Sequence, residues 1–200
     1  CRTSPPFHTE GKQPMIELTQ DTFDQIGPLL ADSARGGAFV SAVLEGNHVG
    51  RIFVDDGEAP SAALVALACE FNYPLGNAGD PVVRAEMLDL LGGELLPSDG
   101  YAFVFPTSDA WHATFEALLR DARELIRASR DEYDFSRQRF GHAHAGWREA
   151  VPAGVEVRDY NGELAAGQQL EAFWGSLDAF LARGIGVAVT RDGEIVSRCH

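Results

Sequence analysis

The stretch from Asp80 to Gly92 carries both the start and the stop signal of a helix, and it constrains the fold more than any other segment. Asp80 is a favoured N-cap, Pro81 follows at the first helical position, and Gly92 lies just past the last apolar residue. The apolar residues between them recur at helical spacing. Because strand-like runs lie before and after this helix, we expect an α/β protein with a mixed sheet.

The residues before this helix predict a strand, two helices and two paired strands. Thr22 and Gln25 have the spacing of a helix capping box, and Pro28 either kinks the first helix or restarts it after Gly27. Cys69, at the end of the second strand-like run, is interpreted as a small buried hydrophobe. The expected elements are a strand at 16–18, helices at 22–30 and 39–44, and strands at 48–55 and 62–69.

The residues after the helix predict a second series of strands and helices. Tyr101–Phe105 has the composition of a compact buried strand, and Ser108 can cap a long amphipathic helix. A helical series over 170–181 stops at Gly184, and Ser176 can divide it into two short helices. The remaining elements are a strand at 155–159 that turns at Asn161-Gly162, and a hairpin at 185–196 with its turn at Asp192-Gly193.

The composition narrows the class of protein and of partner. Thirty acidic and sixteen basic side chains give a net charge of -14, which repels phosphate backbones and anionic lipids. Nucleic acid and membrane surfaces are therefore not expected partners. The same charge would attract cationic amines, although we favour a role in solubility. The three cysteines have no paired spacing and no apolar run could span a bilayer, so we expect a cytoplasmic protein.

The chain is expected to contain two folded parts. Residues 1–14 are polar and lack the apolar core of a signal peptide, so we interpret them as a disordered or non-native leader, with translation starting at Met15. An N-terminal α/β domain is expected over 15–134. A charge-mixed linker at 135–150 then leads to a third segment, 151–200.

Several segments of the sequence resemble one family of acetyltransferases. WGSLDAFLARGIGVAV followed by TRDGEIVSRCH looks like the GNAT N-acetyltransferase family, and in particular the subfamily that includes the zwittermicin-resistance acetyltransferases. LEGNHVGRIFVDDGEAP with the later FNYPLGN looks like the N-terminal domain of that subfamily. The resemblance runs from about Met15 to the end and implies an N-terminal α/β domain followed by the first half of a GNAT fold.

The resemblance implies transfer of an acetyl group from acetyl-CoA to a small-molecule amine, by attack of the neutral amine on the thioester. The family holds the cofactor's pyrophosphate on backbone N–H groups of a Q/R-x-x-G-x-G/A loop that follows the hairpin. Two loose matches occur, at 138–143 and at 183–188, but neither has a strand before it and a helix after it. We therefore expect a chain truncated within the return strand and inactive by itself, with no catalytic or cofactor-binding residue.

Side-chain alternation places Ser197 and Cys199 on one face of the last strand. By analogy with the family, that face would approach the substrate. The alternative interpretation is that both are ordinary solvent-facing residues of a hairpin.

Two other polar clusters are weighed as binding sites. Asp55–Gly57 could form a carboxylate site, but acidic residues beside glycine favour a turn. His142 and His144 could share a metal with His112 or His200, but the paired spacings of zinc sites are missing, so we favour exposed linker histidines and no metal.

A second hypothesis is a non-catalytic α/β module that binds a ligand or a protein. A reading frame that continued past His200 into another strand, a Q/R-x-x-G-x-G/A loop and a helix would favour the enzyme. A stop codon there in an intact gene would favour the binding module. The sequence leaves the amine and the oligomeric state open.

Overall fold

The computed structural model describes residues 15–96, 101–121, 126–128, 136–143, 145–146 and 150–199. Residues 1–14, expected to be a leader, lie outside this range. Contacts divide the chain into two units. The first contains the described residues of Cys1–Glu124 together with Ala172–Gly175, and the second those of Leu125–Glu171 and Ser176–His200.

The first unit is built on a five-stranded mixed sheet. The strands follow the order of the sequence across the sheet, and only the last pair is parallel. Every residue of the central strand is buried, as expected for a strand covered on both faces. The strands are β1 (Ile16–Glu17), β2 (Gly50–Val54), β3 (Ala62–Leu67), β4 (Phe71–Gly76) and β5 (Phe103–Val104).

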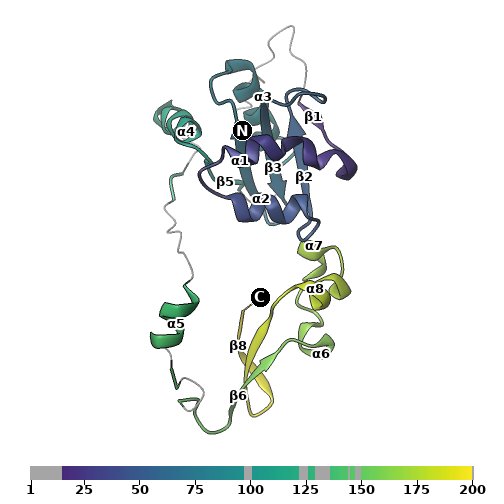
Figure 1. The fold of residues 1–200 in the computed structure, drawn as a ribbon, viewed down its shortest axis with the longest axis vertical. Helices are drawn as coiled ribbons and strands as arrows, with labels where there is room; N and C mark the ends of the chain where they lie inside the picture. The colour runs from purple at the N-terminus through teal and green to yellow at the C-terminus, as the bar shows by residue number, and fades with distance from the viewer. Residues whose placement is uncertain are drawn as a thin grey trace, which may run out of the picture. The chain divides into compact units, whose positions relative to one another are not determined.

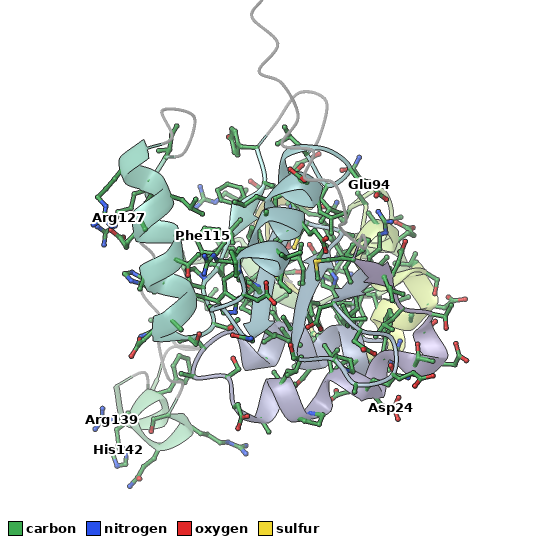
Figure 2. The ribbon with its side chains drawn as sticks, turned by 90° about the horizontal axis from the view of Figure 1, so that it is seen from above. Asp24, Glu94, Phe115, Arg127, Arg139 and His142 are labelled. Atoms are coloured by element: carbon green, nitrogen blue, oxygen red, sulfur yellow. The ribbon has the colours of Figure 1, made fainter. Side chains whose placement is uncertain are left out.

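Helices cover both faces of this sheet. On β2, Ile52 and Val54 join one apolar cluster and Phe53 joins the other, as alternation of side chains requires. In Figure 1, α1 and α2 cross one face of β2 and β3. Phe115 points from α4 toward the sheet in Figure 2 and packs against the second cluster. The helices are η1 (Gln20–Ile26), α1 (Gly27–Ala31), α2 (Gly37–Leu44), α3 (Pro81–Gly92) and α4 (Asp109–Asp121).

The start signals of α1, α3 and α4 agree with the structure, and the one expected at Thr22 does not. Asp80 accepts hydrogen bonds from the N–H groups of Val82 and Val83, and Ser108 accepts one from Trp111 N–H, so the caps of α3 and α4 are confirmed. Pro28 lies in the first turn of α1, which restarts the helix. The capping box at Thr22 is wrong, because η1 begins earlier, after Thr19.

The edge of the five-stranded sheet formed by β5, next to β4, differs from the strand predicted there. β5 spans two residues, and Tyr101 has 69% of its surface exposed, so the compact buried strand predicted for 101–105 is wrong. β5 is an edge strand that pairs with β4. Cys69 lies in the turn after β3 and is partly exposed, which corrects its placement within a buried strand.

The second unit has an antiparallel three-stranded sheet in the order β6-β7-β8. Asp192 and Gly193 both have positive φ, of 52° and 85°, which confirms the two-residue turn between β7 and β8. Asn161 does not form the predicted turn. Its side chain accepts a hydrogen bond from Leu164 N–H and caps α6. The elements are α5 (Arg137–Ala143), β6 (Val155–Asp159), α6 (Gly162–Ala165), α7 (Glu171–Trp174), α8 (Leu177–Arg183), β7 (Val187–Arg191) and β8 (Glu194–Cys199).

The division of the 170–181 helical series is confirmed, because α7 and α8 are separate and Ser176 Oγ caps α8 through Ala179 N–H at 3.0 Å. Within the described residues, no helix is long and apolar enough to cross a membrane. The fold class predicted from the sequence, α/β with a mixed sheet, is the one observed.

Candidate functional site

Ser197 and Cys199 both lie on β8 and both are exposed. In the pairing with β7, Ser197 is opposite Val189 and Cys199 is opposite Val187. Directly paired residues of antiparallel strands point to the same side of a sheet. The two polar side chains therefore share one face with two half-buried valines.

A β-bulge sets this arrangement. Ile195 is paired with Thr190 and Ser197 with Val189, so Val196 is an extra residue on β8. Thr190 is 3% exposed, so it faces the buried side of the sheet. The bulge therefore turns Ser197 to the side opposite that of Thr190.

The opposite face of the sheet is buried at its central strand, β7. Ala188 alternates with the two valines and is fully buried. Leu164 of α6 and Phe180 of α8 are buried in the same unit. Arg198, paired with Ala188, donates a hydrogen bond to the Gln168 side chain. At β7, the side that carries Ser197 and Cys199 is therefore the more exposed of the two.

The strand pairing adds a carboxylate to the exposed face. Asp159, the last residue of β6, is paired with Val187, which is in turn paired with Cys199. Asp159 and Cys199 therefore lie two strands apart in one row, about 10 Å from backbone to backbone. Val157, 40% exposed, begins the neighbouring row, which continues through Val189 to Ser197.

Sequence reasoning missed Asp159 as a member of this face. Its alternation with Val155 and Val157 was a usable signal, because residues two apart on a strand share a face. What the sequence did not provide was the register between β6 and β7. The face can do two things chemically: present a negative charge to a cation, and offer a hydroxyl and a thiol as hydrogen-bonding groups.

The two loose matches to a cofactor loop do not fit a pyrophosphate cradle. The whole of the first match lies inside helix α5, where backbone N–H groups serve the helix itself. In the second, Gly184 N–H donates to Phe180 O at 2.6 Å and ends α8. A Cβ added at Gly186 would lie 2.6 Å from the Tyr160 ring, so this glycine allows a ring to pack. Neither match is suited to hold acetyl-CoA.

The acidic turn at Asp55 and Asp56 is satisfied by its own backbone. Asp55 accepts hydrogen bonds from Ser61 N–H, Ser61 Oγ and Ala62 N–H. Asp56 accepts from the N–H groups of Glu58 and Ala59, and these bonds lower the pKa of its carboxyl. The carboxylates therefore stabilise a turn, which is the interpretation that we favoured.

Two of the histidines weighed as metal ligands make contacts within their own helices. His142 Nδ1 lies 2.8 Å from Gln138 O within α5, and His112 lies 3.8 Å from Glu116 on α4. His144 and His200 lie outside the described residues. Among the residues that are described, no group of three or more His, Cys, Asp or Glu could hold a metal.

Comparisons with known proteins agree with the arrangement of elements. A family model described as GNAT acetyltransferase matches residues 28–200. An uncharacterized N-acetyltransferase of Bacillus subtilis strain 168, YdfB, is 20% identical over an alignment of 194 residues that covers 92% of this chain and 69% of that protein.

A solved structure shows the same fold. It is the GCN5-related N-acetyltransferase-like protein from Streptococcus suis 89/1591, matched with a TM-score of 0.57 at 19% identity over 89% of this chain and 69% of that chain. The family model covers all but the first 27 residues, and its match includes both units. The chain belongs to the GNAT acetyltransferase family.

Proposed function

We propose that the protein transfers an acetyl group from acetyl-CoA to a small-molecule amine. The observation that carries this proposal is the family match over 28–200, which includes the sheet β6-β7-β8 and its exposed face. The amino-acid sequence of residues 174–200 also supports membership of the zwittermicin-resistance-like subfamily. An acidic chain with no membrane-spanning helix among its described residues suits a cytoplasmic enzyme that acts on a cation.

We further propose that the amine approaches the face of β6-β7-β8 that carries Ser197 and Cys199. The Asp159 carboxylate gives that face a negative charge for an ammonium group. Ser197 can donate or accept one hydrogen bond, and the valine rows favour an apolar part of the substrate. We therefore propose that Asp159 binds the charged ammonium group and that Ser197 orients the amine by a hydrogen bond. Cys199 would lie next to the bound amine.

Residues 1–200 are proposed not to turn over acetyl-CoA by themselves. The support is that the two loop matches lie in α5 and between α8 and β7, where neither fits the cofactor. We keep the domain assignment as part of the same proposal: an N-terminal α/β domain over 15–134, a linker over 135–150 and an acetyltransferase part over 151–200.

The test uses the protein as its gene encodes it, beside the 200-residue chain. Each is incubated with acetyl-CoA and a panel of amines, and acetylated product is measured by mass spectrometry. We expect product from the natural protein and none from the 200 residues. Turnover by the 200 residues overturns the proposal of inactivity, and absence of product and of acetyl-CoA binding in the natural protein overturns the enzyme proposal in favour of a binding module.

Asp159→Asn tests the amine-binding face in the natural protein. Removing one charge at an exposed site should raise KM for a cationic amine about two- to fivefold and leave kcat nearly unchanged, since an exposed ion pair contributes at most about 1 kcal/mol. Glu156→Gln is the matched control, because Glu156 pairs with Thr190 on the other face of the sheet. An equal KM in wild type and Asp159→Asn would remove Asp159 from the proposed site.

A further inference from the structure

The loop between α2 and β2 contacts a segment that is distant in the sequence. Val49 N–H donates a hydrogen bond of 2.7 Å to the carbonyl oxygen of Phe173. The rings of His48 and Phe173 are 5.8 Å apart between centroids and inclined at 47°. A Cβ at Gly175 would lie 3.8 Å from Val49 Cγ2. By their contacts, Ala172–Gly175 belong to the N-terminal unit.

The loop is also held by hydrogen bonds within the N-terminal unit. The N–H groups of Asn47 and His48 both donate to Ala42 O near the end of α2, at 2.7 and 2.9 Å. His48 Nδ1 lies 2.7 Å from Val49 O, and since a carbonyl can only accept, Nδ1 carries the hydrogen. Ala68 N–H also donates to Val49 O, at 3.1 Å. The Val49 N–H therefore belongs to a loop that is fixed at several other points.

The segment that the loop contacts consists of the last three residues of α7 and Gly175. Gly175 lies between α7 and α8. Its φ is 76°, a backbone conformation that residues other than glycine rarely adopt. Ser176 then caps α8. The residues directly before and after Ala172–Gly175 belong to the second unit. The flanking strands β6 and β7 also belong to that unit, where they pair with each other. Four residues of the connection from β6 to β7 thus pack with the N-terminal unit.

We propose that the Asn47–Val49 loop is a docking site for the Ala172–Gly175 segment, with His48 and Phe173 as the positioning residues. This docking lies within the N-terminal unit, to which Ala172–Gly175 belong by their contacts. It stands independently of the proposed function.

Hydrogen exchange of the 200-residue chain, followed amide by amide with NMR, tests the docking without any assay of activity. His48→Ala and Phe173→Ala should each speed exchange of the Val49 amide about tenfold, because each removes the ring contact that supports its hydrogen bond. The double variant should exchange no faster than the faster single variant, since both changes break one contact. The Val65 amide in β3 should keep its wild-type rate in every variant.

Matched controls separate docking from general loosening. His112→Ala removes an exposed histidine of α4, and Ile185→Ala removes a side chain that is 84% exposed, so neither should change the Val49 rate. If Phe173→Ala unfolds the second unit, seen as faster exchange at Val189, Phe173→Leu keeps most of the bulk and removes only the ring. A Val49 amide that exchanges in the wild type as fast as an unprotected one, or effects that multiply in the double variant, would overturn the proposal.

Discussion

At the residue scale, Gly186 shows how one missing side chain allows two aromatic rings to pack. An ideal Cβ there would lie 2.6 Å from Tyr160 Cδ2 and 2.9 Å from Phe180 Cζ. The Tyr160 N–H also donates to Gly186 O at 2.8 Å, so the backbone has little room to move away. The two rings meet edge to face, with centroids 6.0 Å apart. A methyl group at Gly186 would have to displace this pair.

We therefore expect Gly186→Ala to lower the free energy of unfolding of the second unit by about 1–3 kcal/mol, the usual cost of overpacking a core. Urea denaturation followed at a probe in β6-β7-β8 measures it. Gly162→Ala is the control, because a Cβ there meets nothing within 4 Å at the start of α6. That variant should be neutral or slightly more stable than the wild type. Equal stability of the two variants would contradict the packing argument.

A second feature at the residue scale is Arg51 of β2, whose side chain binds a residue of β1 and a residue that follows α3. Its guanidinium donates two hydrogen bonds of 2.6 Å to Glu17 and one of 2.5 Å to Glu94, and lies 4.7 Å from the centroid of the Phe53 ring. The hydrogen bond from Arg51 is the largest cause of the lowered pKa of Glu17, followed by burial, which opposes it, and then by the charge of Arg51.

A lowered carboxyl pKa makes a contribution to stability that is present above the unfolded-state pKa and is lost as the pH falls through the folded-state value. Glu17→Gln should therefore lower stability at pH 7, by less than about 1 kcal/mol since the pair is partly exposed, and the difference should vanish well below pH 4. Urea titrations at pH 7 and pH 3 measure this. Glu58→Gln in the exposed turn should be neutral at both, and a Glu17→Gln effect that is independent of pH would be inconsistent with the ion pair.

At the element scale, β4 is the strand that the sequence did not predict, and its position explains why. Pro74 lies within it and has no N–H to donate, which normally argues against a strand inside a sheet. β5 pairs with β4 only at Phe71 and Asn72, so the β5 side is open at Pro74. There the Thr107 hydroxyl, 1% exposed, donates to Pro74 O. A side chain 33 residues away thus replaces part of the ladder, and no local pattern predicts that.

Thr107→Val should lower the free energy of unfolding by about 1–3 kcal/mol, because it keeps the shape of the side chain and leaves the Pro74 carbonyl without its hydroxyl donor. Thermal or urea unfolding of the chain measures the change. Thr114→Val is the matched control, since Thr114 is on α4 and its hydroxyl only donates to Ala110 O one turn earlier. Its effect should stay within about 0.5 kcal/mol. A Thr107→Val variant as stable as this control would show that β4 does not need the hydroxyl.

Elements with local signals at both ends were predicted well, and those that depend on distant partners were not. Asp80 caps α3, and the helix ends one residue later than expected, with Gly92 as its last residue and Gly93 as its C-cap. Asp192-Gly193 forms a turn that needs only two residues. Asn161 was assigned to a turn because the same residue types begin turns and helices. In the candidate site, alternation predicted that Ser197 and Cys199 share a face, while Asp159 joined them only through the pairing of β6, β7 and β8.

At the scale of the whole molecule, the division into units could not be read along the chain. Ala172–Gly175 is assigned to the N-terminal unit by contacts with a loop more than 120 residues earlier. Composition, by contrast, does describe a property of the whole chain. With a net charge of -14 on 200 residues, the excess negative side chains repel one another in the compact state. Salt weakens this repulsion because it shortens the Debye length.

We therefore expect the melting temperature at pH 7 to rise by a few degrees between about 10 mM and 200 mM NaCl, as screening weakens the repulsion. Near pH 5, close to the pI of about 4.7, the rise should be much smaller because the net charge is small. Differential scanning fluorimetry at both pH values gives the comparison. A melting temperature that falls with salt at pH 7 would mean that ion pairs such as Arg51–Glu17 outweigh the overall repulsion.

The extra residue Val196 in β8 has a consequence for how this face can change. In a regular ladder, Val196 and Arg198 would stand opposite Val189 and Val187, and the hydroxyl and thiol would turn toward the helices. A return strand of the same sequence that paired without the bulge would therefore exchange the side chains on the two faces in one step. Point substitutions would need a separate change at every position after the bulge, so related proteins that keep these residues but lack the bulge are expected to present different surfaces to their ligands.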